Sequence, residues 1–200
     1  MAIFQTFGGF TSGIGIQYED SIITRSALQS SAQSLIVGQR ILPKIFLRAA
    51  DFRPVEIQDL LPSDGRFKIL VFTGDSSVPS QLQKIGNITS SLENALGVIA
   101  RNCGCETGQI HDLFEILGIS SAGKLANALV TVSVVIEAFS ESSQVMLIRA
   151  LIDDVDASGK LAGGGYKNYG VGREGAMVVV LPDGYVGLRS IRAEWCLRAA

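Results

Sequence analysis

Hydrophobic and polar positions first alternate with the period of a strand and later recur with the period of a helix. Residues 44–48 alternate polar and apolar side chains, as a half-buried strand does, and residues 68–72 form the apolar run of a buried strand. From Pro79 onward, apolar side chains recur at steps of three and four, which places them on one helical face. They are Leu82, Ile85, Ile88, Leu92, Leu96 and Ile99. The pattern predicts a strand followed by a long helix that packs on it.

The end of the chain carries the strongest turn signal. Two runs of β-forming residues, 177–181 and 185–189, flank Pro182-Asp-Gly184. Proline fixes φ and glycine accepts a positive φ, so this combination predicts a β-hairpin. A βα unit followed by an antiparallel hairpin implies a mixed sheet flanked by helices, with residues 68–72 and 177–181 in the same sheet. This is the arrangement of a thioredoxin-like α/β domain.

The region between the long helix and the hairpin is less regular. Residues 112–117 and 124–128 are predicted as short helices on either side of Gly118, and the valine-rich stretch 129–136 is predicted as an interior strand. Further on, the glycine-rich stretch 163–172 lacks the lysine and serine or threonine of a phosphate-binding loop. We expect it to be a mobile loop.

The three aspartates just before that stretch offer two interpretations. Asp153, Asp154 and Asp156 could ligate calcium, but the glycine and glutamate of an EF-hand loop are missing at the required offsets. A solvated acidic turn is the interpretation we favour, and no metal site is expected.

Size and composition limit the class of protein. Two hundred residues fit one domain, 1–200, in which residues 1–35 are expected to be a partly extended N-terminal segment. With 47% hydrophobic and 18% charged residues and a net charge of −2, the chain is not disordered and has no electrostatic reason to bind nucleic acid or an anionic membrane. No signal peptide or membrane span is expected, because basic residues are absent before Arg25 and the most apolar window, 125–139, is short and contains polar residues. An odd number of cysteines, three, favours a reducing cytoplasm.

Several ordered motifs together resemble one known family. They are Asp51-Phe-Arg-Pro-Val55, Leu60-Leu-Pro-Ser-Asp-Gly-Arg-Phe67, Ile69-Leu-Val-Phe-Thr-Gly-Asp75 and Pro182-Asp-Gly-Tyr-Val-Gly187, with similar stretches at residues 9–13, Tyr18, 38–43 and 169–171. The chain resembles the C-terminal domain of fungal phenol 2-monooxygenases over nearly its whole length. It departs at Leu181, where the family commonly has arginine, and over residues 103–124. An altered partner surface or a new pocket could explain both departures.

The resemblance implies a thioredoxin-like domain that contributes to subunit association and holds neither FAD nor the hydroxylation chemistry. The chain itself has no Gly-x-Gly-x-x-Gly nucleotide fingerprint between a strand and a helix, so no cofactor is expected. At the place where a redox thioredoxin carries its cysteine pair, residues 73–79 contain no cysteine. Cys103 and Cys105 follow the long helix instead, and unbridged thiols are the simplest interpretation.

Catalytic residues can be named only as candidates. His111 is the single histidine and so the only side chain that ordinarily exchanges protons near neutrality, although a lone histidine is usually a surface or capping residue. Asp183 and Tyr185 have a complete explanation as turn residues. Tyr185 with Tyr166 and Tyr169 could also line a pocket for an aromatic or polyketide ligand.

Two functions follow from these observations. The first is a non-redox association module that forms a homodimer or pairs with a flavin-dependent aromatic hydroxylase. The alternative is a stand-alone, cofactor-independent isomerase or cyclase of fungal aromatic or polyketide secondary metabolism, with His111, Tyr169, Tyr185 and Asp183 as candidate catalytic residues.

Overall fold

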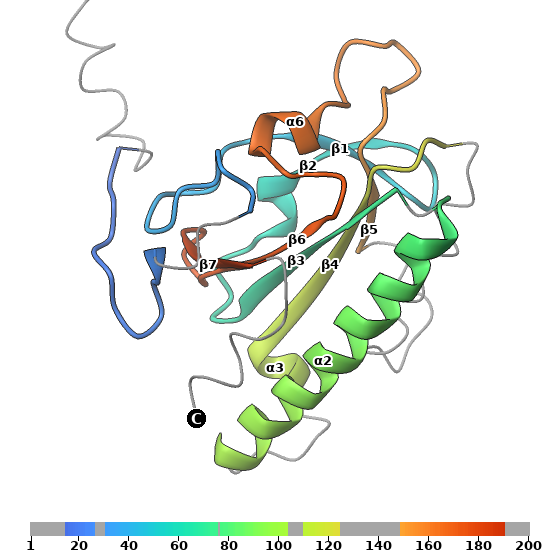
Figure 1. The fold of residues 1–200 in the computed structure, drawn as a ribbon. Coiled ribbons are helices and arrows are strands. Elements are labelled where there is room, and N and C mark those ends of the chain that lie inside the picture. The colour runs from blue at the N-terminus through green and yellow to red at the C-terminus, as the bar shows by residue number, and fades with distance from the viewer. Residues whose placement is uncertain (1–14, 27–30, 76, 104–109, 125–148, 191–200) are drawn as a thin grey trace, which may run out of the picture.

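A seven-stranded mixed sheet forms the centre of the molecule (Figure 1). The computed structural model describes residues 15–26, 31–75, 77–103, 110–124 and 149–190. The strands are β1 (Ile45–Arg48), β2 (Pro54–Glu56), β3 (Phe67–Gly74), β4 (Phe114–Ser120), β5 (Ala150–Ile152), β6 (Ala176–Val180) and β7 (Val186–Ser190). The helices are the 3-10 helix η2 (Ile57–Leu60), α2 (Pro79–Cys103), α3 (Ile110–Leu113) and α6 (Gly165–Tyr169).

The strand order is β2-β1-β5-β4-β3-β6-β7. The central strands β3, β4 and β5 run parallel, and every other neighbouring pair is antiparallel. Leu70 of β3 lies opposite Val178 of β6, so the two runs predicted to share a sheet are direct neighbours. A parallel βαβ centre with an antiparallel hairpin at one edge is the thioredoxin-like arrangement, and the predicted fold class is confirmed.

Helix α2 crosses one face of the sheet (Figure 1). Its predicted apolar side contains Ile85, Leu92 and Leu96, all nearly inaccessible, with Ile88 and Ile99 half-buried; the side chain of Leu82 lies outside the described part. These side chains pack on Ile69 and Val71 of β3 and on their neighbours in β4 and β6. Each fully buried aliphatic side chain contributes roughly 1.5–3 kcal/mol, so this face fixes the helix on the sheet.

The opposite face of the sheet is covered by α6, η2 and residues 31–41. Because side chains alternate along a strand, Leu70 and Phe72 point to this second face while Ile69 and Val71 point to α2. Tyr166 and Tyr169 from α6 pack edge-on against Phe72, with ring centroids 5.3 and 6.2 Å away. The tyrosines of the glycine-rich stretch are therefore part of the core.

The prediction of a helix over residues 112–117 was wrong. Helix α3 ends at Leu113, and residues 114–120 form β4, with Gly118 inside the strand. Strand β4 lies between β3 and β5 and has almost no exposed side chain, so its sequence lacks the polar alternation that marks a half-buried strand. Residues 125–136, predicted as helix and strand, lie outside the described residues, as do Cys105, Cys196 and the side chain of Cys103.

The interpretation of residues 153–172 also needs correction. Part of the expected loop is the helix α6, whose first N–H groups, at Gly165 and Tyr166, donate to the Asp153 carboxylate at 2.7 and 2.8 Å. Asp156 is buried and accepts hydrogen bonds from the backbone N–H groups of Lys160 and Leu161 at 3.0 and 2.8 Å. The acidic turn is thus a set of backbone caps rather than a solvated segment.

Candidate interaction surface at the C-terminal hairpin

The turn between β6 and β7 is a closed, hydrogen-bonded loop. The Leu181 N–H donates to the Tyr185 carbonyl at 2.7 Å, and the Gly184 N–H donates to the Leu181 carbonyl at 2.9 Å. Gly184 has a φ of +87°, which glycine adopts without a steric penalty. Asp183 turns its carboxylate back, and its Oδ1 accepts from the Tyr185 N–H at 3.3 Å. The predicted Pro-Asp-Gly hairpin is confirmed, and it holds Asp183 and Tyr185 in fixed positions.

Tyr18, from the N-terminal part of the chain, lies directly on this turn. Its ring stacks on Tyr185 with centroids 4.4 Å apart and an angle of 19° between the planes. Its hydroxyl donates to Asp183 Oδ2 at 2.8 Å, and this hydrogen bond to a carboxylate raises the pKa of the phenol. Two of the motifs that carried the family resemblance therefore meet in space.

Gly38 makes the close approach of Tyr18 sterically feasible. The Tyr18 N–H donates to the Gly38 carbonyl, and the Gly38 N–H donates to the Val186 carbonyl, each at 2.8 Å. A Cβ atom at Gly38 would lie 2.3 Å from the Tyr18 carbonyl oxygen, and its φ is +83°. Any other residue here would push the chain away from the hairpin.

We call residues 15–26 the arm. The arm and residues 38–41 together cover the outer edge of β7: the Val186 N–H donates to the Gln39 carbonyl at 2.9 Å, and the Arg25 N–H donates to the Gly187 carbonyl at 3.1 Å. Covering this edge hides a row of strand N–H and C=O groups that could otherwise pair with another chain. Figure 1 shows the arm (blue) beside β7, well away from α2.

The arm exposes several apolar side chains. Ile22 is 90% exposed and Ile23 is 52% exposed, and both follow the half-exposed Ile16 and Tyr18. Four of the ten exposed large apolar side chains that the structure describes lie in the arm. Isolated apolar residues on a surface are ordinary, whereas a concentration of them marks an interaction site.

The other candidate residues lie elsewhere. The Tyr169 hydroxyl donates to the Leu42 carbonyl at 2.6 Å, and the Tyr166 hydroxyl donates to the Ile119 carbonyl at 2.6 Å. Burial raises the pKa of both phenols, so they remain neutral donors. His111 lies on α3, and its side chain is outside the described part of the chain. The structure therefore brings Asp183 and Tyr185 together, while the catalytic role of all four candidates stays a prediction.

At the position expected for a thioredoxin redox motif, Asp75 closes a local turn just before α2. At the start of α2, the N–H and hydroxyl of Ser77 donate to Asp75 Oδ1 at 3.0 and 2.6 Å, which lowers the pKa of this carboxyl. Nearby, the buried Gln81 amide donates to the carbonyls of Thr73 and Glu174 at 2.8 and 3.1 Å. The segment that leads into α2 thus carries a hydrogen-bonded carboxylate and no cysteine.

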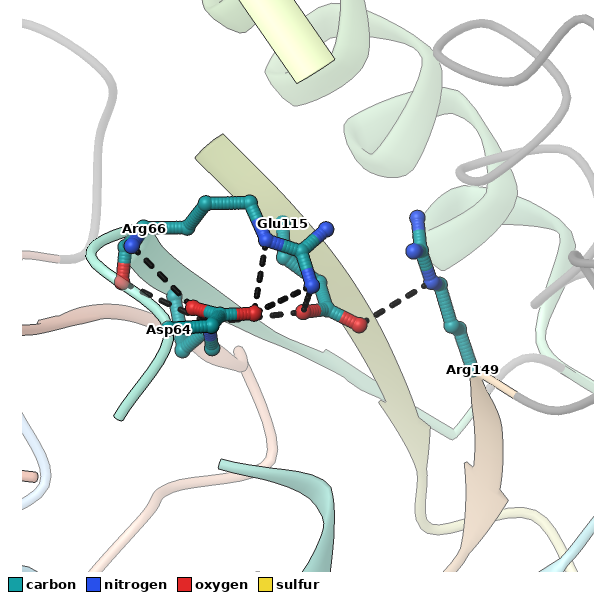
Figure 2. A network of polar contacts seen from close by, with 5 residues as sticks. Asp64, Arg66, Glu115 and Arg149 are labelled. Carbon is teal, nitrogen blue, oxygen red and sulfur yellow. Dashed lines mark hydrogen bonds and ion pairs between the residues drawn. The ribbon is translucent and has the colours of Figure 1, made fainter. Parts of the chain in front are cut away.

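A charge network at the amino ends of β3 and β4 was not anticipated from the sequence (Figure 2). Glu115 lies between Arg66 and Arg149, with nitrogen to oxygen distances of 3.0 and 3.1 Å. Lys68, almost completely buried, pairs with Asp64 at 2.5 Å. Hydrogen bonds from Arg66, and then from Lys68, hold the pKa of Asp64 well below its usual range. The network joins three segments that are distant in sequence, which hydrophobic periodicity cannot indicate.

Within the described residues, no three histidine, cysteine, aspartate or glutamate side chains are grouped so as to hold a metal ion. None of the described helices combines the length and apolar character needed to cross a bilayer.

Comparison with known proteins places the chain in a family. Residues 16–191 match the family model described as phenol hydroxylase, C-terminal dimerisation domain, and the chain belongs to this family. Among curated proteins it is 30% identical over 191 residues to FAD-dependent monooxygenase terD of Aspergillus terreus, and 29% identical over 189 residues to Phenol 2-monooxygenase fsqG of Aspergillus fumigatus. These alignments cover 92% and 90% of this chain but 30% and 29% of the relatives.

The chain therefore spans about three tenths of the length of these curated relatives. Among solved structures, a thiol:disulfide interchange protein from Bacteroides sp. matches with a TM-score of 0.47 and 13% identity, over 80% of this chain and 85% of that one. The family resemblance expected from the sequence is confirmed, and the chain is a dimerisation module related to phenol hydroxylases.

Proposed function

We propose that the chain is a non-redox association module that forms a homodimer or pairs with a flavin-dependent aromatic hydroxylase. The outward side of the arm, held over β7 by Tyr18, supports this proposal. Family membership supplies the role of dimerisation, and the exposed isoleucines of the arm supply a surface that would gain from being buried. The proposal places the protein in the cytoplasm, as a partner in the chemistry of aromatic compounds and secondary metabolism.

Burial of Ile22 carries the energetic argument. Its side chain is 90% exposed, so almost all of its apolar area would leave water in a complex. At about 25 cal/mol per Å² of apolar surface, one isoleucine contributes roughly 1.5–3 kcal/mol. In a two-fold dimer the contribution occurs twice, once for each copy.

Sedimentation equilibrium of the purified chain tests the proposal. We expect a reversible monomer–dimer equilibrium with a dissociation constant in the micromolar range or tighter. Ile22→Asp should weaken it about 10-fold or more, because a charged group then replaces a buried apolar one. Leu161→Asp is the matched control, since Leu161 is 56% exposed but lies in the loop before α6, away from the arm.

Sedimentation equilibrium of a mixture of the chain and a flavin-dependent aromatic hydroxylase tests whether the two proteins pair. A complex that forms with the unchanged chain and weakens with Ile22→Asp would support pairing with the hydroxylase. A chain that stays monomeric at every concentration, alone and in the mixture, would contradict the proposed function.

A further inference from the structure

The turn between β1 and β2 presents an aromatic side chain in a strained conformation. Phe52 has a φ of +56°, in the left-handed region that bulky residues avoid, and its side chain is 39% exposed. Glycine at this position would avoid the strain. The part of the ring that stays exposed contributes nothing to the fold, and a strained, partly exposed apolar residue is a candidate for a contact outside the molecule.

The turn is rigid around Phe52. Arg48 forms a bidentate ion pair with Asp51. Its Nε lies 2.9 Å from one carboxylate oxygen, and one terminal nitrogen lies 2.6 Å from the other. The Phe52 N–H donates to the Arg48 carbonyl at 2.8 Å, and the Arg48 N–H donates to the Arg53 carbonyl at 2.9 Å. A pre-organised apolar residue loses little conformational entropy on binding, which favours it as an anchor.

The charges at the turn and at the arm are opposite. Arg48 and Asp51 neutralise each other, so the exposed Arg53 leaves one positive charge beside Phe52. On the arm, the exposed Glu19 and Asp20 lie just before Ser21 and the two isoleucines, and the exposed Arg25 follows them, so the arm has one net negative charge. Each surface thus combines apolar side chains with charge, and the two charges differ in sign.

The two surfaces lie at opposite edges of the sheet. The arm covers β7, and the Phe52 turn joins β1 to β2 at the other end of the strand order (Figure 1). A single molecule therefore cannot bring them together. A reciprocal contact, with the arm of each copy against the turn of the other, repeats the same contact twice about a two-fold axis and requires both surfaces to face the same side of the molecule.

We infer that Phe52 and Arg53 of one copy dock on Ile22, Ile23 and Glu19 of a second copy. The inference rests on the proposed self-association and names the contact that produces it. Phe52 supplies the apolar anchor against the isoleucines, and Arg53 pairs with Glu19 at the rim, which sets the orientation of the two copies.

Phe52→Gly tests the anchor in a variant that cannot be dismissed as misfolded. The substitution removes both the ring and the backbone strain, so the melting temperature of the monomer should be no lower than that of the unchanged chain. The dimer dissociation constant should rise at least 10-fold in sedimentation equilibrium. Unchanged association in a folded Phe52→Gly variant would overturn the inference.

Charge reversal tests the partner residue. Arg53→Glu and Glu19→Arg should each weaken the dimer roughly 10-fold, because each creates two like-charged pairs across the interface. The double variant should recover most of the loss, as coupled partners do. Lys160→Glu, at an exposed position in the loop before α6, changes the net charge equally and should leave association unchanged.

The outcomes separate this inference from the proposed function. If Ile22→Asp weakens the dimer but neither Phe52→Gly nor Arg53→Glu does, the self-association stands and this contact is wrong. The contact is likewise wrong if the double charge reversal shows no recovery. Species larger than a dimer would indicate an open head-to-tail chain and overturn the reciprocal arrangement.

Discussion

The hydroxyl of Tyr18 donates a hydrogen bond to the carboxylate of Asp183, which lies 165 positions later in the chain. Tyr18→Phe keeps the stack on Tyr185 but removes this bond, and should lower the free energy of unfolding by about 0.5–1.5 kcal/mol. Tyr18→Ala also removes the stack and should cost more. Urea unfolding gives the free energies, and hydrogen exchange of the Arg25 amide reports whether the arm stays on β7. Equal effects of the two variants would show that the stack contributes nothing.

The charge network predicts how stability depends on pH. Because hydrogen bonds from Arg66 and Lys68 lower the folded-state pKa of Asp64, its stabilising contribution is complete above the unfolded-state pKa of about 4 and is lost as the pH falls through the lower folded value. Asp64→Asn should therefore destabilise the chain at pH 7, and the difference from the unchanged chain should narrow below about pH 4. Urea unfolding at pH 7, 5 and 3 measures this difference in the free energy of unfolding.

Asp59 is exposed and lies outside the network. Asp59→Asn is therefore the matched control, because it removes the same charge as Asp64→Asn. A gap between Asp64→Asn and the unchanged chain that stays constant from pH 7 to pH 3 would mean that Asp64 keeps no lowered pKa in the folded state.

At the scale of elements, two glycines should respond to alanine with opposite signs. Gly175 precedes β6 with a φ of +84°, and a Cβ there would lie 2.1 Å from the Phe72 carbonyl oxygen. Gly175→Ala should cost about 2 kcal/mol or more. Gly86 lies inside α2, and a Cβ there would meet no atom within 4 Å beyond the local helix backbone, so Gly86→Ala should stabilise the helix by roughly 0.5–1 kcal/mol. Thermal unfolding shows whether each variant is more or less stable than the unchanged chain.

Elements with a strong period could be predicted from the sequence. Helix α2 shows six apolar positions at steps of three and four, and the final hairpin shows two β-rich runs around a Pro-Asp-Gly turn. Strand β4 was predicted as helix because it lies inside the sheet with both of its faces covered. Its sequence therefore does not alternate between polar and apolar side chains. Helix α6 was missed because its cap, Asp153, lies twelve residues before the first N–H that it accepts.

The candidate surface could be predicted only in part, because its residues come from segments that are far apart in the sequence. The motif around Asp183 and Tyr185 was visible as a turn, and Tyr18 was visible as a separate shared feature. Their contact depends on the arm returning to β7, a pairing across most of the chain that local patterns do not encode. The strain at Phe52 is likewise a property of the backbone angle and leaves no mark in the residue type.

On the scale of the whole molecule, the two edges of the sheet carry the features that the core does not need. The arm covers the edge at β7 and turns isoleucines outward, while the short β2 ends the sheet at the other side with an exposed proline. Proline and short length make that second edge a poor partner for strand addition. Association by side chains, rather than by extension of the sheet, is what this arrangement favours.

If association buries the arm, stability must depend on protein concentration. A partner that binds only the folded chain raises its melting temperature by mass action, so the melting temperature of the unchanged chain should rise as its concentration goes from below to well above the dissociation constant. Ile22→Asp should shift this dependence to about 10-fold higher concentration or more, while leaving the melting temperature at low concentration near that of the unchanged chain, because an exposed isoleucine contributes little to the monomer fold. Scanning calorimetry over a roughly 100-fold concentration range measures both effects, with Leu161→Asp as the control. A concentration dependence that is unchanged in Ile22→Asp would place the association surface elsewhere than on the arm.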